Sequence, residues 1–217
     1  LDTNTGVATL TANATNGVMA VTGTINGGAA TEGVLVVKDD DATAAGDLVT
    51  FASAIGVTNQ LADVQIGSAT EAGNALFEAA VDSVLITLDG GDNSAETSLA
   101  EFRNSITATT INIDDNTGAA TLTVNATNGA QTVAGAINGV TAGDGILAII
   151  DDDADAGPDA ITVSGTVGAS NKLGDITVGN ATQGGSVIFS ADATVTIDRL
   201  TVTGGNNSAE DSVAQFQ

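Results

Sequence analysis

An internal repeat is the strongest constraint on how this chain can fold. The sequence NTGVATLTANATNG at residues 4–17 returns as NTGAATLTVNATNG at residues 116–129, with 12 of 14 positions identical and an offset of 112 residues. Repetition at a fixed period indicates that one supersecondary block has been copied and that the copies pack against each other. The chain therefore contains at least two units of an array.

The two copies cover nearly the whole sequence. Further matches are ING at 25–27 and 137–139, DDD at 39–41 and 151–153, and GGDNSAE at 90–96 against GGNNSAE at 204–210, where two extra residues move the offset to 114. We assign residues 1–112 to repeat unit 1 and residues 113–217 to repeat unit 2. Residues 103–113 have no counterpart after Phe216. A unit that lacks this segment is expected to accept one from a neighbour by strand addition.

Inside a unit, apolar and polar residues alternate with a period of two. Short runs of this kind occupy residues 7–12, 18–25, 34–37, 48–55, 61–66, 75–81, 84–88 and 106–113. They are rich in Val, Ile, Thr and Ala and end at Gly, Asn or Asp, which is typical of β-strands. The best helical candidate is one turn at residues 96–102. We therefore predict an all-β fold.

Two architectures fit this pattern. The chain has no Trp, no Tyr and five Phe, so its core must consist of thin layers of small side chains, as in a β-solenoid of tandem repeats. The alternative is two tandem antiparallel β-sandwich domains, for which about 112 residues is a suitable size. Asn16-Gly17 and Asn128-Gly129 support this alternative, because Asn-Gly between alternating strands is a strong hairpin signal.

Four phenylalanines recur at equivalent places in both copies. They are Phe77, Phe102, Phe189 and Phe216. Since they are the largest apolar side chains of each unit, we expect them to fill the core.

The charge balance excludes several kinds of partner. Twenty-seven carboxylates face four basic residues, which gives a formal net charge of -23. Nucleic acids and anionic membrane surfaces attract clustered Lys and Arg, and the chain has no such cluster. No apolar run approaches the length of about 20 residues that a membrane helix needs. An acidic surface suits a salty exterior with divalent cations, or simply keeps a repetitive β protein soluble.

The residue types also argue against catalysis. The chain has neither His nor Cys, which removes Ser-His-Asp, Cys-His and the usual zinc sites. Paired carboxylates serve as acid and nucleophile in glycosidases, but such sites usually add aromatic platforms for the sugar, and Phe is the only aromatic residue here. We therefore expect a protein that is not an enzyme and requires no cofactor.

The acidic runs are the one candidate for specific ion chemistry. Calcium takes six to eight oxygen ligands, and neighbouring aspartates on a loop supply several of them. The candidate calcium ligands are Asp39, Asp40, Asp41, Asp151, Asp152 and Asp153. Their spacing matches neither an EF-hand loop nor a glycine-rich calcium repeat. A solvated acidic loop is the alternative interpretation.

The segments GDLVTFASAIGVTNQLADVQIGSAT at 46–70 and DAITVSGTVGASNKLGDITVGNAT at 159–182 resemble the β-strand repeats of bacterial surface proteins. The resemblance is to the passengers of autotransporter-like and surface-layer-like outer-membrane proteins. It implies an extracellular location and a non-catalytic fibre, sheath or surface-layer lattice. Copies of the chain itself are then the expected partner, joined end to end or side by side. The alternative function is a stalk or passenger segment of an adhesin.

Overall fold

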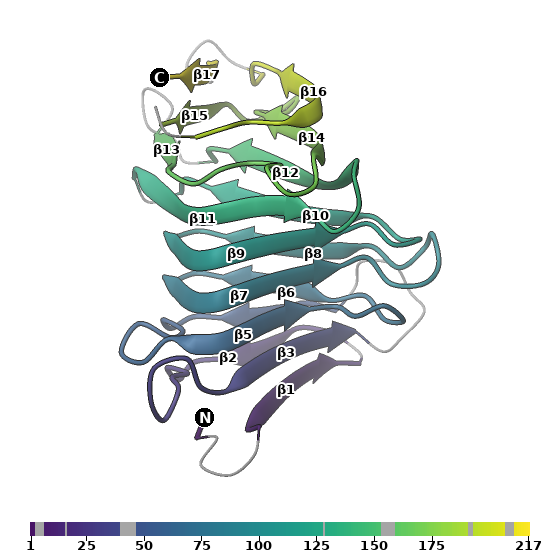
Figure 1. Cartoon of the computed structure of the whole chain (residues 1–217), viewed down its shortest axis with the longest axis vertical. Helices are drawn as coiled ribbons and strands as arrows, with labels where there is room; N and C mark the ends of the chain where they lie inside the picture. The colour runs from purple at the N-terminus through teal and green to yellow at the C-terminus, as the bar shows by residue number, and fades with distance from the viewer. Residues whose placement is uncertain are drawn as a thin grey trace.

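The computed structural model describes residues 1–2, 7–15, 17–39, 47–127, 129–152, 159–190, 193–206 and 211–217. Within these ranges the chain forms 17 strands and no helix. The strands stack one above another from the N-terminus at the bottom to the C-terminus at the top (Figure 1). Successive strands alternate between two sheets that share one apolar core. This arrangement is a β-solenoid, as predicted.

Each sheet collects every second strand of the chain. In spatial order the nine-stranded sheet contains β1 (Thr9–Ala14), β3 (Val34–Asp39), β5 (Leu61–Ile66), β7 (Val81–Asp89), β9 (Ile106–Asp114), β11 (Gln131–Gly139), β13 (Ala160–Val163), β15 (Gly185–Phe189) and β17 (Ser212–Phe216). The eight-stranded sheet contains β16 (Ile197–Val202), β14 (Leu173–Val178), β12 (Asp144–Ile150), β10 (Ala120–Asn125), β8 (Ser98–Phe102), β6 (Asn74–Phe77), β4 (Val49–Phe51) and β2 (Met19–Val21).

All pairings between these strands are parallel. The hairpin interpretation of the Asn-Gly pairs, and the antiparallel sandwiches that it supported, are therefore wrong. Gly17 and Gly129 do have the positive φ of a tight turn, at 117° and 99°. The turn carries the chain from one sheet to the other, because β1 and β2 lie in different sheets, as do β10 and β11.

The core consists of layers that repeat along the stack. In many strands alternate residues point inward, as in β13 and β15, where every second side chain is buried. Phe51, Phe77 and Phe102 form a ladder on β4, β6 and β8, with ring centroids 5.0 and 4.6 Å apart. Phe77, Phe102 and Phe189 are at most 1% exposed, which confirms their predicted place in the core. For Phe216 the prediction is wrong, since it is 56% exposed on the last strand, β17.

The two repeat units are related by half a turn about the stack. Strands β1 to β8 correspond to β10 to β17, so one repeat spans nine strands. Because nine is odd and strands alternate between sheets, each strand of unit 1 and its equivalent in unit 2 lie in opposite sheets. β1, for example, begins the nine-stranded sheet, whereas β10 lies within the eight-stranded one. The boundary between units at residues 112 and 113 lies inside β9.

Equivalent corners keep their local geometry despite this half turn. Gly56 and Gly168 have φ values of 73° and 70°, and a Cβ at either position would overlap a backbone carbonyl oxygen of the next coil, that of Asp82 or Thr196. Only glycine satisfies both constraints. The repeated glycine therefore fixes where the chain turns and how closely the next coil packs.

Candidate functional site

The described residues of the acidic runs lie at equivalent places in the two repeat units. Asp39 ends β3 and Asp151 follows β12, and each is 7% exposed. Asp152 is exposed. The other three predicted calcium ligands, Asp40, Asp41 and Asp153, lie outside the described residues.

Carboxylates at these places bind backbone amides. One oxygen of Asp151 accepts the N–H of Asp159 at 2.7 Å, and Asp47 accepts the N–H of Gly17. Asp39 ends a strand of the nine-stranded sheet, whereas Asp151 follows a strand of the eight-stranded sheet. No group of three or more metal-ligating side chains occurs in the described ranges. Calcium binding by the acidic runs stays a prediction.

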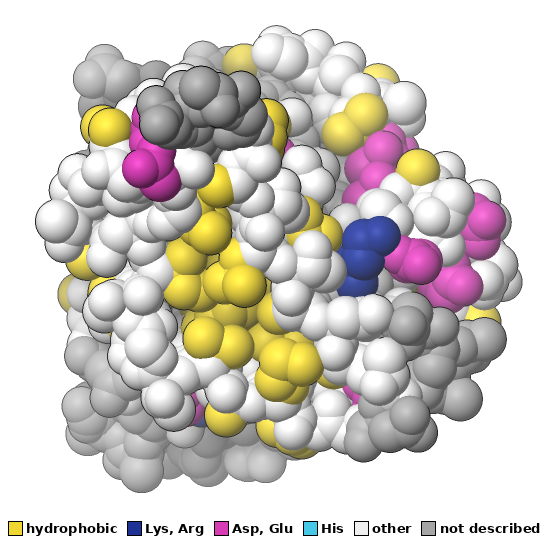
Figure 2. Space-filling view, turned by 90° about the horizontal axis from the view of Figure 1, so that it is seen from below, with side chains coloured by type: hydrophobic (Ala, Val, Ile, Leu, Met, Phe, Trp, Pro, Cys, Tyr) yellow, Lys and Arg dark blue, Asp and Glu magenta, His cyan; other side chains and the backbone are white. Residues whose placement is uncertain are grey.

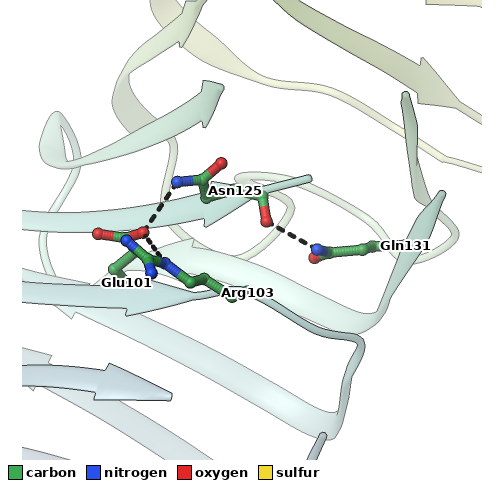
Figure 3. A network of polar contacts seen from close by, with 4 residues as sticks. All are labelled: Glu101, Arg103, Asn125 and Gln131. Atoms are coloured by element: carbon green, nitrogen blue, oxygen red, sulfur yellow. Dashed lines mark hydrogen bonds and ion pairs between the residues drawn. The ribbon is translucent and has the colours of Figure 1, made fainter. Parts of the chain in front are cut away.

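A network of polar contacts lies at the boundary between the two units (Figure 3). Glu101 on β8 accepts hydrogen bonds from Arg103 Nε at 2.6 Å and from Asn125 Nδ2 at 2.8 Å. The Gln131 side chain, from β11, donates to the backbone oxygen of Asn125 at 2.7 Å. The hydrogen bond to Glu101 raises the pKa of Arg103. Sequence reasoning missed this network, because its members come from three strands whose register could not be read from the residues alone.

A shallow groove lies beside this network. Its volume is about 260 Å³, and its lining residues are Leu48, Asn74, Ala75, Leu76, Leu99, Ala100, Glu101, Arg103 and Thr123. Leu99 is 37% exposed. The groove offers apolar side chains beside one ion pair, that of Arg103 and Glu101.

Two equivalent aspartates of the repeat units, Asp63 and Asp175, have different partners. Asp63 on β5 is held by Gln65 at 2.6 Å, and its other oxygen has no partner among the described residues. Burial raises the pKa of Asp63 above its usual value. The equivalent Asp175 on β14 instead receives Arg199 of β16, with Nε to Oδ1 at 2.9 Å.

The C-terminal end face, formed by β16 and β17, exposes residues whose equivalents are buried. Leu200, Val202 and Phe216 are 37%, 46% and 56% exposed. Their equivalents in unit 1, at an offset of 114, are Ile86, Leu88 and Phe102, each 0% exposed. The residues at this end match residues that are buried inside the stack, but no further strand of the described chain covers them.

The N-terminal end face, formed by β1 and β2, has the same property. Figure 2 looks at this end and shows a band of apolar side chains across its centre, with the backbone and other side chains on either side. Leu10 is 38% exposed, whereas its equivalent Leu122 is 0% exposed. The two end faces are therefore the most distinctive surfaces of the molecule: each combines an open sheet edge with an uncovered core.

In comparisons with known proteins, no protein-family model matches the chain, and no curated protein or solved structure matches it. Within the described ranges, no helix is long and apolar enough to span a membrane.

Proposed function

We propose that this chain is a non-catalytic structural protein that assembles with copies of itself into an extracellular fibre, sheath or surface-layer lattice. The observation that carries the proposal is the pair of uncovered end faces. An edge strand without a partner presents a row of free N–H and C=O groups, which is a template for another strand. Here the row lies beside an open apolar core at both ends.

Apolar burial provides a driving force for this assembly. Covering an apolar side chain contributes about 25 cal/mol for each Å² removed from water. Leu10 at one end, and Leu200, Val202 and Phe216 at the other, are all more than a third exposed. The terminal strands β1 and β17, with sequences TLTANA and SVAQF, contain no charged residue. They can therefore meet without burying a charge.

Charge sets the conditions under which assembly occurs. Each chain carries a formal net charge of -23, so two chains repel each other at low ionic strength. Salt at about 0.1 M reduces the screening length to about 10 Å. Association through the uncharged strands β1 and β17 then meets a weaker long-range repulsion. This dependence fits an acidic protein that works in a saline exterior.

The test is assembly of the purified chain in a concentration series, with and without added sodium chloride. We expect unbranched filaments in electron micrographs and a sedimentation coefficient that rises with concentration and with salt. Leu10→Asp and Phe216→Asp place a charge on the end faces and should abolish the filaments. Val140→Asp is the matched control, because Val140 is 40% exposed but lies between the ends, after β11. A monomer at every concentration, even in salt and calcium, would contradict the proposal.

The groove beside Glu101 favours a second function, the stalk or passenger of an adhesin. An apolar recess on the outside of the eight-stranded sheet is suited to contact with another protein along the side of the solenoid. If this is the function, Leu99→Asp should remove binding to a cell surface or matrix while filaments of the chain alone are unaffected.

A further inference from the structure

We propose that a second copy of this chain docks with its β1 on β17, in the parallel register that β10 holds on β8. This joint would extend the nine-stranded sheet and leave a slot for one strand beside β16. The inference rests on the proposed function and specifies its contact. It follows from the fact that the chain already contains one junction between repeat units.

The internal junction supplies the register. β8 pairs with β10 through Leu99 and Thr121, Ala100 and Leu122, and Phe102 and Val124. β17 is the equivalent of β8, and β1 is the equivalent of β10. Transfer of the same register places Thr9 of the incoming copy opposite Val213, Leu10 opposite Ala214, Thr11 opposite Gln215, and Ala12 opposite Phe216.

Side-chain sizes support this register. At the internal junction, Leu122 lies over the small Ala100 and Val124 lies over the ring of Phe102. At the proposed joint, Leu10 would lie over Ala214 and Ala12 would cover the exposed ring of Phe216. At the proposed joint a large residue thus meets a small one in each of these two layers, as close packing requires.

The polar residues are also compatible. Asn125, which donates to Glu101 at the internal junction, corresponds to Asn13 of β1, and Glu101 corresponds to Gln215 of β17. A glutamine side-chain oxygen accepts the same hydrogen bond as a carboxylate. The contact therefore keeps the hydrogen bond and loses the charge.

The half turn between repeats determines which sheets meet. One repeat of nine strands exchanges the sheets, so two repeats restore them, and the nine-stranded sheet of one copy continues into that of the next. The strand equivalent to β9 would belong to the eight-stranded sheet, between β16 and the incoming β2. That position is the slot.

The first two residues identify the strand that fits the slot. Leu1 lies 112 residues before Ile113, which is near the end of β9. The Leu1 carbonyl accepts the N–H of Gly28, and the Ile113 carbonyl accepts the N–H of the equivalent Val140.

The same two side chains pack against equivalent glycines. Gly33, with φ of 79°, lies against the side chain of Leu1, and Gly145, with φ of 81°, lies against that of Ile113. Leu1 and Asp2 thus take the places of the last two residues of β9, and Leu1 bonds to the backbone of Asn26 and Gly28, which follow β2. A segment with the sequence of β9 is the occupant that the slot fits.

Cysteine cross-linking tests the register, because the chain has no native cysteine. Paired residues on neighbouring strands are about 4.8 Å apart. A disulfide spans a Cα separation of about 4.4–6.8 Å, so it can link such a pair. Equal amounts of Thr9→Cys and Val213→Cys chains are mixed and oxidised, and Thr11→Cys with Gln215→Cys forms the second predicted pair. Thr9→Cys with Gln215→Cys is the matched control, displaced by two residues to a separation of about 8 Å.

We expect at least about tenfold more cross-linked dimer from each predicted pair than from the displaced pair. Equal yields from all three would overturn the proposed register. If filaments form but none of the pairs links, this inference fails while the proposed function stands. If no filaments form at all, the proposed function itself fails.

A synthetic peptide covering residues 103–112 tests the slot, because Leu1 and Asp2 of the incoming copy already hold the places of Ile113 and Asp114. By filling it, the peptide should lower the concentration needed for filament formation several-fold, and a scrambled peptide of the same composition should have no effect. Equal behaviour of the two peptides would show that no strand of the β9 type is accepted beside β16.

Discussion

Strands β2 and β11 hold equivalent places in the two repeat units but differ in length. β11 spans nine residues, Gln131–Gly139, with the sequence QTVAGAING, whereas β2 spans only three, Met19–Val21, within the matching sequence MAVTGTING. β11 lies between β9 and β13, while β2 has a partner only in β4. The comparison indicates that a neighbouring coil on each side extends the strand beyond what its sequence specifies.

β8 and β17 are also equivalent strands of the two units, and again the strand at the end of the stack is the less covered one. The inward-facing residues of β8 are all buried, whereas all of β17 is at least partly exposed. Both strands carry a phenylalanine stacked on the previous coil, Phe102 on Phe77 and Phe216 on Phe189. A coil inside the stack is covered on both sides and a terminal coil on only one, so equivalent residues contribute differently to stability.

The largest expected difference in stability is between alanine substitutions of the two equivalent phenylalanines. Phe102→Ala removes a fully buried ring and should lower the free energy of unfolding by about 3–5 kcal/mol. Phe216→Ala removes a ring that is 56% exposed and should cost about 1 kcal/mol, because much less area leaves the core. Chemical denaturation of the two variants under conditions that keep the chain monomeric measures the difference.

Filament conditions provide the control for this comparison. If the end face is covered in the assembled state, the cost of Phe216→Ala should rise towards that of Phe102→Ala. Equal costs in the monomer would contradict the distinction between interior and end coils.

The second largest difference in stability is expected between alanine substitutions of two glycines with positive φ. Gly56 packs against the next coil, so Gly56→Ala adds both backbone strain and an overlap with the Asp82 carbonyl and should cost about 2–4 kcal/mol. Gly17, with φ of 117°, faces open space, and a Cβ added there would have no neighbouring atom within 4 Å. Gly17→Ala should therefore cost only the strain, about 1–2 kcal/mol. Thermal unfolding of both variants checks the order, and a larger loss for Gly17→Ala would refute it.

The sequence predicted the fold class well because its signals are local. Residues 61–66 were predicted as a strand and form β5 with the same bounds. Residues 96–102 were the best helical candidate, and that prediction is wrong, since β8 begins at Ser98. Local propensity there yields to pairing with β6 and β10 on either side.

The half turn and the end faces were not predictable in the same way. The number of strands per repeat decides whether equivalent residues share a sheet, and a single missed strand, β8, changes that number from odd to even. The exposure of Phe216 depends on what lies above β17, which no property of residues 212–216 encodes. The acidic runs were easy to find, but the half turn decides that Asp39 ends a strand of one sheet and Asp151 follows a strand of the other.

The smallest expected effect compares Asp63 with Asp175. Asp63 faces Leu85 across the ladder, whereas Asp175 faces Arg199. Since burial raises the pKa of Asp63, the folded state binds its proton more tightly than the unfolded state. The contribution of Asp63 to stability therefore improves as pH falls through its folded pKa towards 3.8 and is unfavourable at neutral pH.

Asp63→Asn should accordingly raise the free energy of unfolding at pH 7 by about 1 kcal/mol, with the gain disappearing near pH 4. Asp175→Asn should instead lower it slightly, because it breaks a solvent-exposed ion pair. Leu85→Arg gives Asp63 the partner that Asp175 already has, and it should remove most of the benefit of Asp63→Asn. Denaturation curves at pH 4 and pH 7 measure these differences. If the two asparagine variants changed stability equally at both pH values, the half-buried carboxylate of unit 1 would not differ energetically from its paired equivalent in unit 2.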